Sequence, residues 1–145
     1  MKKLIRIITT LLIPLIFVGC AMNQSLHIPA SEGDLDKVRS EIEAGKNVDS
    51  KDAAGQTSLM YAAETGRMDV LKYLISKGAD VNAESQGYGR GSALIYAASS
   101  NRLEAMKFLI ENGADASIKN RDDKTALDIA RKLNQVAVAQ VLENQ

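Results

Sequence analysis

The chain has 145 residues, enough for one domain, and its 25% charged and 46% hydrophobic composition is that of an ordinary globular protein. Eighteen basic residues balance eighteen acidic ones, and without residues 1–19 the balance becomes 15 basic against 18 acidic. Such a mildly acidic domain lacks the positive electrostatic potential that attracts phosphate groups, so we expect no nucleic-acid partner. One histidine, one cysteine and no tryptophan argue against a zinc site, a disulfide and the common catalytic triads. We therefore expect no enzyme, no metal and no cofactor.

The first twenty residues have the pattern of a secretory signal. Lys2, Lys3 and Arg6 form a positive start, and the stretch 7–18 that follows carries no charge. As a helix this stretch rises about 18 Å, against roughly 30 Å of hydrocarbon, so a comfortable transmembrane span is not available. We therefore predict a signal peptide over residues 1–19.

The sequence Phe17-Val18-Gly19-Cys20 resembles the bacterial lipobox, in which a peptidase cuts before a cysteine acylated on sulfur. Val18 departs from the alanine or serine that is usual there. The resemblance implies a lipid-anchored Cys20, a short tether over residues 20–25, and a place in the bacterial cell envelope. Ala21 differs from the enterobacterial inner-membrane retention signal, which implies the outer membrane and a domain facing the periplasm. The alternative is a plain signal peptide or an uncleaved anchor with an incidental cysteine, and it too leaves the body outside the cytoplasm.

The rest of the chain contains about four copies of one sequence motif. Leu59, Leu94 and Leu127 lie in matching segments and follow one another at a nearly constant interval. Residues that tolerate positive φ at helix ends recur in step with these leucines. They are Gly33, Gly66, Asn101 and Asn134 after the first helices and Gly45, Gly78 and Gly113 after the second helices. This periodicity predicts repeating units of about 33 residues with two helices each.

These segments resemble ankyrin repeats over residues 26–145. The loop sequences at 78–82 and 113–115 match the family, as do the helix starts at Thr57 and Thr125. The resemblance implies an all-α solenoid of about four helix-turn-helix units joined by hairpin loops. The expected units are approximately 26–54, 55–89, 90–122 and 123–145.

This chain departs from the family pattern in two respects. The Thr-Pro-Leu-His motif lacks its proline and histidine in the three full matches. Pro29 falls where an alanine is normal, so we expect a short or irregular first helix. We expect Thr57, Ser92 and Thr125 to serve as N-caps. Polar end units predict a complete array and a monomer.

Three features that might carry chemistry are better explained by structure. The segment 87–91 is glycine-rich but follows no predicted strand and lacks the ending of a phosphate-binding loop. Asp122 and Asp123 precede a helix, where turn chemistry and the helix dipole account for them. His27 has no partner histidine, so a structural or exposed role is expected rather than metal binding.

One loop is enlarged, because the step from Val81 to Leu94 is longer than the matching step from Val48 to Leu59. Tyr88 and Arg90 lie on that loop and are residue types enriched at interface hot spots. Tyr61, Tyr73, Tyr96 and Phe108 fall instead at shared repeat positions, which indicates framework roles.

In ankyrin proteins the hairpin tips and the inner side of each first helix form the usual concave binding surface. Carried over by position, the resemblance names Lys51, Ala53, Gln56, Glu64, Thr65, Tyr88, Arg90, Ser99, Ser100, Arg121, Asp122, Lys124 and Lys132. We therefore expect an envelope adaptor that binds another protein. An immunity protein that binds a periplasm-delivered toxin is the alternative, and an enzyme or small-ligand receptor is a remote one.

Overall fold

The computed structural model describes residues 25–86 and 91–144. The predicted signal peptide, Cys20, Tyr88 and Arg90 lie outside the described residues. Every named element in the described ranges is a helix, and the one isolated β-bridge there joins Lys51 to Thr57. The all-α prediction is confirmed.

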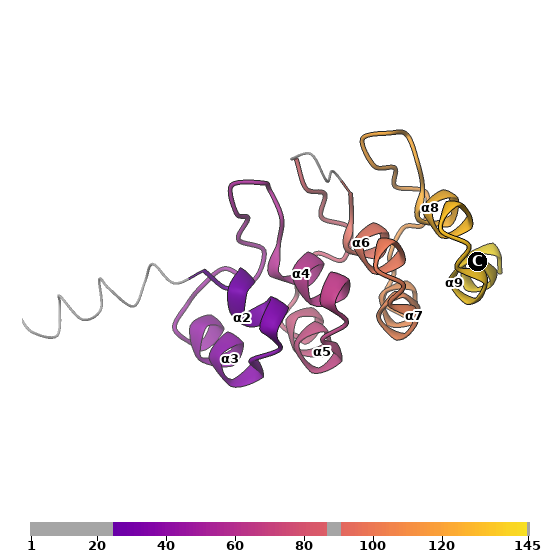
Figure 1. Ribbon diagram of the computed structural model, residues 1–145. Helices are drawn as coiled ribbons and strands as arrows, with labels where there is room; N and C mark the ends of the chain where they lie inside the picture. Colours follow the sequence, from indigo (N-terminus) through magenta and orange to yellow (C-terminus); the bar gives the residue numbers. More distant parts are fainter. Residues whose placement is uncertain (1–24, 87–90, 145) are drawn as a thin grey trace, which may run out of the picture.

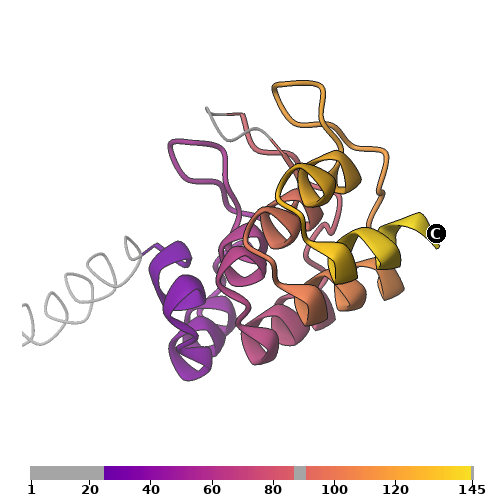
Figure 2. The same cartoon turned by 45° about the vertical axis from the view of Figure 1, so that its right-hand side comes forward.

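The helices form four antiparallel pairs that stack side by side (Figure 1). We call the pairs units 1 to 4, and residues at the same position in successive units counterparts. The inner helices lie in one layer, the outer helices lie in a second layer, and the connecting hairpin loops project beside the inner helices (Figures 1 and 2). The inner helices are α2 (His27–Glu32), α4 (Ser58–Thr65), α6 (Ala93–Ser99) and α8 (Ala126–Lys132), and the outer helices are α3 (Leu35–Glu43), α5 (Met68–Ser76), α7 (Leu103–Glu111) and α9 (Val136–Glu143).

Capping explains where the inner helices begin. Thr57 and Thr125 each accept a hydrogen bond from the amide three residues on, and that residue's side chain accepts one in return. Ser92 holds the N-cap position of α6, as predicted, but its hydroxyl makes no capping bond and is buried without a partner. In unit 3 the third helical residue is Ile95, whose side chain has no acceptor to complete the reciprocal pair.

Left-handed residues end the inner helices, as the sequence predicts. Gly33 and Gly66 have φ of 83° and 74°, and their counterparts Asn101 and Asn134 have φ of 56° and 57°. Glycine and asparagine reach this region at low cost, so the chain reverses at the same place in every unit. Two successive units can then stack in the same register.

A continuous apolar core lies between the two helix layers. Leu71, Leu74, Met106 and Leu109 of the outer helices are fully buried, as the three-and-four spacing predicts. Alanines fill the close approach of neighbouring inner helices, with Ala62, Ala63, Ala97, Ala98 and Ala130 all at 0% exposure. All the buried core residues fall between Leu26 and Leu142, so residues 21–145 contain the whole described core.

Unit 1 is held to the next loop by the single histidine. Helix α2 has only six residues and contains Pro29, so the predicted short first helix is confirmed. His27 is 8% exposed, its Nε2 lies 3.1 Å from the Ser50 carbonyl oxygen, and its Nδ1 pairs with the Ser25 hydroxyl. His27 is therefore a structural residue whose polar atoms are satisfied within the fold.

Two arginines join units at the turns between helices. The Nε of Arg67 donates to the Ser31 carbonyl at 3.2 Å, and the Nε of Arg102 donates to the Glu64 carbonyl at 3.0 Å. A Cβ at Gly33 would lie 2.9 Å from the Cδ of Arg67, so the arginine chain rests directly on the glycine. The turns of units 2 and 3 are thus positioned over the last turn of the preceding inner helix.

Candidate protein-binding surface

The hairpin loops are held in a row by side chains that bond to the next loop. The Oδ1 of Asp49 accepts from the Asp80 amide at 2.9 Å, and the Oδ1 of Asn82 accepts from the Asp115 amide at 2.8 Å. The Nδ2 of Asn82 also donates to the Gly113 carbonyl at 3.1 Å. These bonds fix the spacing of the loops, so the surface is preorganised.

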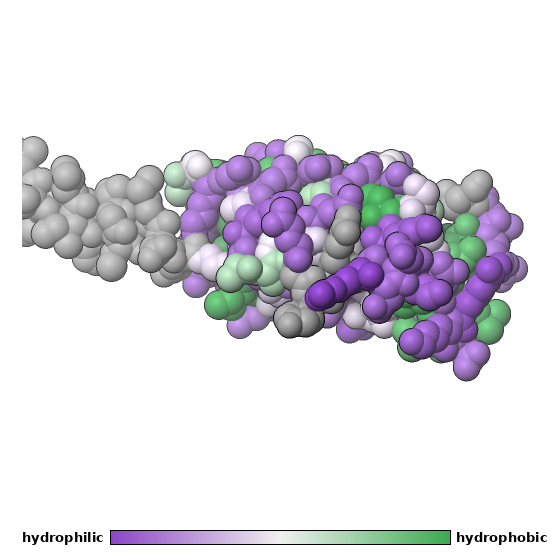
Figure 3. All heavy atoms as spheres, turned by 90° about the horizontal axis from the view of Figure 1, so that it is seen from above, coloured by the Kyte–Doolittle hydropathy of each residue, from purple (hydrophilic) through white to green (hydrophobic). Residues whose placement is uncertain are grey.

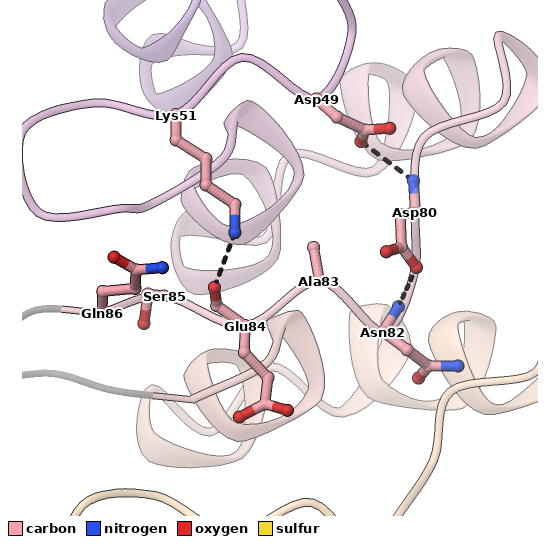
Figure 4. Close-up of a pocket in the computed structure, with 8 residues that line it drawn as sticks. All are labelled: Asp49, Lys51, Asp80, Asn82, Ala83, Glu84, Ser85 and Gln86. Carbon is pink, nitrogen blue, oxygen red and sulfur yellow. Dashed lines mark hydrogen bonds between the residues drawn. The ribbon is translucent and has the colours of Figure 1, made fainter.

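The first two hairpins enclose an open polar groove of about 580 Å³ (Figure 4). The ammonium of Lys51 lies across it and donates to the Glu84 carbonyl oxygen at 3.0 Å. Three carboxylates and this one ammonium give the groove a negative balance. Its lining comprises Asp49, Lys51, Asp80, Asn82, Ala83, Glu84, Ser85 and Gln86.

The first hairpin is also tied to the inner helix beneath it. The Tyr61 hydroxyl donates to the Oδ2 of Asp52 at 2.7 Å, and the Tyr61 ring lies 5.6 Å from that of His27. The bond to Asp52, together with burial, raises the pKa of Tyr61 to about 12. Burial acts to raise the pKa of Asp52, but the Tyr61 hydroxyl and the amides of Gln56 and Ala54 outweigh it and lower the pKa.

Two of the residues predicted to bind a partner make bonds inside the solenoid. Lys51 bridges to the second hairpin, and the Nε2 of Gln56 donates to the hydroxyl of Tyr96, which is 9% exposed. Tyr61 and Tyr96 are therefore framework residues, as their repeat positions predict. Partner binding by Lys51 and Gln56 stays a prediction.

The inner helices present their last turns beside the loops. Glu64 and Thr65 are half-buried at the end of α4, and Ser99 is exposed and Ser100 half-buried at the end of α6. The hydroxyls of Thr65 and Ser99 donate to carbonyls one turn back within their own helices. Their oxygen lone pairs can still accept hydrogen bonds from a partner.

The third hairpin carries exposed charges of both signs, which are Lys119, Arg121, Asp122, Asp123 and Lys124. The Oδ1 of Asn120 accepts from the amides of Asp122 and Lys124, and Asp123 adopts a left-handed φ of 56°. Turn chemistry thus accounts for the two aspartates. Across the described ranges, no group of three histidine, cysteine or acidic side chains is placed to hold a metal ion.

Sequence reasoning missed the bonds between hairpins. Their signal was nevertheless present, since Asp49 and Asn82 occupy the same repeat position, four residues after Gly45 and Gly78. Short side chains with a carboxylate or amide oxygen are the types that cap neighbouring backbone amides. The bonding types at these two positions were therefore readable from the sequence, although the groups that they bond in the next loop were not.

Hydrophilic side chains dominate the face formed by the hairpin tips (Figure 3). The bonds described above engage backbone groups of neighbouring loops, and charged tips such as Lys124 stay exposed. Of the helices that the structure describes, none has the length and apolar character needed to cross a membrane. The arrangement suits recognition of a polar macromolecular surface by a rigid scaffold.

Three curated relatives each match less than half of the chain. The chain is 42% identical over 60 residues to palmitoyltransferase akr1 of Schizosaccharomyces pombe, covering 41% of this chain and 9% of the relative. It is 37% identical over 59 residues to human protein phosphatase 1 regulatory subunit 27, covering 41% and 38% respectively. It is 32% identical over 60 residues to the mouse ankyrin repeat, SAM and basic leucine zipper domain-containing protein 1, covering 41% and 13%. The chain thus spans well under two thirds of the length of each of these relatives.

A family profile described as ankyrin repeats in three copies matches residues 7–85, 26–120 and 84–145. The match over 26–120 alone exceeds half of the chain. Ankyrin repeats are protein interaction modules that typically have no catalytic activity, which agrees with the preorganised polar surface described above. The chain belongs to the ankyrin-repeat family.

Proposed function

We propose that the chain is a lipid-anchored adaptor of the bacterial cell envelope that binds a folded protein on its hairpin tips and inner-helix ends. The observation that carries this proposal is the row of hairpins joined by Asp49 and Asn82, which hold charged tips at fixed spacing. A preorganised surface loses little conformational freedom on binding, so its contacts contribute more fully to affinity. Charges of both signs on the tips fit a protein partner better than a polyanion.

The membrane part of the proposal rests on the sequence ahead of the solenoid. The positive start, the short apolar stretch and the cysteine at position 20 fit an acylated N-terminus. Each buried methylene of an acyl chain contributes about 0.8 kcal/mol, so two or three chains anchor a protein of this size. Replacing Cys20 by serine should prevent acylation and leave the chain uncleaved or mislocalised. A serine variant that still reaches the outer membrane in mature form would refute the anchor.

The binding face is tested by photo-crosslinking in cells that produce the full chain. A photoreactive side chain at Ala53, an exposed hairpin tip, should give a discrete adduct with the partner. The matched control is Glu104, which is exposed on the outer helix α7. Adducts from position 104 and none from position 53 would place binding on the outer helices and overturn the proposal.

Once the partner is identified, calorimetry measures the role of the enlarged loop. Replacing Tyr88 and Arg90 together by alanine should weaken binding by about 2 kcal/mol or more, the scale of a hot spot. Thermal stability should hardly change. An unaltered dissociation constant would exclude this loop from the binding surface. Protection of cells by the chain against a periplasm-delivered toxin would instead identify the partner as a toxin and the role as immunity.

A further inference from the structure

The first two hairpins are joined both at their base and at their tips, with the polar groove between these joints. At the base the Oδ1 of Asp49 accepts from the Asp80 amide at 2.9 Å. At the tips the Gln86 amide donates to the Ala54 carbonyl oxygen at 3.2 Å. The walls of the groove are therefore held at a fixed spacing, and what the groove binds depends on the chemistry of its lining.

Two carboxylates of this lining make no ion pair with any residue that the structure describes. They belong to Asp49, which is half-buried, and to Asp80, which is exposed. The ammonium of Lys51 is the basic group of the lining, and it is held by the Glu84 carbonyl oxygen rather than by a carboxylate. The charges of Asp49 and Asp80 are therefore not neutralised by a partner within the groove.

The hydrogen bonds that these two aspartates make do not require their charge. Asn82 is the counterpart of Asp49, and its neutral amide oxygen accepts from the Asp115 amide of the next hairpin at 2.8 Å. Asn47 is the counterpart of Asp80, and each accepts from the amide two residues on at 2.9 Å. Neutral side chains thus fill both structural roles elsewhere in the stack. The negative charge at positions 49 and 80 is available for a group outside the chain.

The negative excess is confined to one part of the binding surface. Residues 47–57 and 79–86 of the first two hairpins carry four acidic side chains and one basic side chain, whereas residues 114–125 of the third hairpin carry three of each sign. The inner-helix ends differ in the same direction, because Glu64 of unit 2 has Lys132 as its counterpart in unit 4. A basic group on a partner is therefore attracted to the first two hairpins rather than to the third, and charge fixes the orientation of the complex.

We propose that the groove between the first two hairpins receives a basic segment of the protein partner, with a lysine or arginine side chain bound by Asp49 and Asp80. This inference rests on the proposed function and specifies the chemistry of the partner at that contact. Carboxylates form charge-assisted hydrogen bonds with ammonium and guanidinium groups, which are stronger than bonds between neutral groups. Opposite charge also speeds the encounter of the two proteins at low salt.

A defined peptide tests the groove before the partner is known. The probe is a short peptide of alternating serine and lysine with blocked ends, added at low salt to the full chain in a zwitterionic detergent. The amide NMR signals of Asp80 and Asn82 should shift with a dissociation constant on the order of 1 mM, because exposed ion pairs contribute little each. The signal of Asp123 in the third hairpin should shift less, and a peptide with glutamate in place of lysine should shift none of them. Equal shifts at Asp123, or equal shifts with the glutamate peptide, would overturn the proposal.

Isosteric variants separate the charge of the groove from its structure. Asp49→Asn with Asp80→Asn keeps an acceptor oxygen at each position, so the double variant should melt in urea like the unmodified chain. It should bind the lysine peptide about fivefold or more weakly, because two ion pairs are lost. Glu104→Gln with Glu111→Gln is the matched control, since it removes as much charge from exposed positions of the outer helix α7 and should leave the affinity unchanged. Unchanged affinity in the aspartate variant, or an equal loss in the control, would overturn the proposal.

Cells that produce the full chain provide a second readout with the protein partner itself. A photoreactive side chain at Gln86, which is exposed and lines the groove, should give an adduct, and mass spectrometry identifies the partner segment joined to it. That segment should carry more lysine and arginine than aspartate and glutamate. A segment without this excess, or an adduct from position 53 and none from position 86, would overturn this inference and leave the binding surface intact. Adducts from position 104 alone would overturn the proposed function together with it.

Discussion

Unit 3 and unit 4 present the same face to different surroundings, and three counterpart positions differ accordingly. In unit 3 the face is covered, and Ile95, Met106 and Ile110 fill it with apolar side chains. In unit 4 the face is uncovered, and the corresponding residues are Asp128, Ala139 and Glu143. Asp128 bonds its own N-cap Thr125, and Glu143 pairs with Arg131. The repeat thus keeps its backbone while the chemistry of this face follows whether a neighbour covers it.

The replacement of apolar residues by polar ones is incomplete at one edge of the uncovered unit 4 face. Val136 keeps the aliphatic character of Leu103 although nothing covers it, and it is 77% exposed. A solubilising end would be expected to carry a polar residue there. The contrast with Asp128 and Glu143 shows that the change from apolar to polar residues on this face does not extend to Val136.

Removing unit 4 should have the largest effect on stability. A chain that stops before Asn120 loses the buried Val138 and Leu142 and uncovers the apolar face of unit 3. From the burial of these side chains we expect a loss on the order of 5 kcal/mol, or aggregation. Urea unfolding followed by circular dichroism measures the change. Deleting only residues 143–145 is the control and should cost little. A soluble truncated domain with an unchanged melt would show that residues 121–145 do not close the stack.

Replacing a single core leucine should have a smaller effect on stability, and the effect should differ between an interior unit and an end unit. Leu74 of α5 is fully buried between neighbouring units, whereas Leu142 of α9 has unit 3 on one side only. Leu74→Ala should cost about 3 kcal/mol or more, because the surrounding helices cannot collapse into the space. Leu142→Ala should cost clearly less, since solvent and side-chain movement relieve part of the cavity. Equal losses in urea unfolding would mean that the end unit is packed as tightly as the interior.

Most of the fold could be predicted from the sequence because it is set within each unit. The spacing of Leu71, Leu74, Met106 and Leu109 predicted the buried faces of the outer helices. Gly33 and Asn134 predicted where the chain reverses after the inner helices. Both depend on local backbone preference and helical period. Pro29 likewise predicted a short α2.

Contacts between units could not be predicted in the same way. The bond from Arg102 to the Glu64 carbonyl joins residues 38 apart, and that from Asp49 to the Asp80 amide joins residues 31 apart. Whether a long polar side chain reaches the next unit depends on the rise and rotation of the stack, which the repeat length alone does not fix. For the same reason the sequence predicted where the charged residues of the binding surface stand in the repeat. It did not predict the hydrogen bond between Gln56 and Tyr96.

Replacing Asn82 should weaken the connection between the second and third hairpins. Asn82→Ala removes both bonds to the third hairpin and should cost about 1.5 kcal/mol, because two net hydrogen bonds are lost at an exposed site. Ser117→Ala is the control, since its hydroxyl bonds only Asp115 within its own loop. Hydrogen exchange should show faster opening of the Asp115 amide in the Asn82 variant alone. Unchanged protection of that amide would contradict the role assigned to Asn82.

The smallest expected effect concerns the bond between Tyr61 and Asp52, and it appears as a dependence on pH. The pKa of the Tyr61 hydroxyl is raised from its ordinary value of about 10 to about 12 in the folded chain. A raised pKa favours the protonated form on folding, so its stabilisation is complete below pH 10. It is lost as the pH rises from about 10 to about 12. Tyr61→Phe should therefore cost no more than about 1 kcal/mol at neutral pH.

The difference in unfolding free energy between the unmodified chain and Tyr61→Phe should shrink steadily across that alkaline window. Lysines elsewhere also titrate there, but they are common to both proteins and cancel in the difference. Asp52→Asn supplies the matched test from the other side of the bond, because its side chain can still accept from the hydroxyl but carries no charge. It should retain part of the stability at pH 7 and lower the pH at which Tyr61 ionises, which ultraviolet difference spectroscopy reads directly. A tyrosine titration identical in the two proteins would mean that Asp52 does not hold the hydroxyl, and the first hairpin would then be tied to unit 2 by its other bonds, such as that from the Asp80 amide to Asp49.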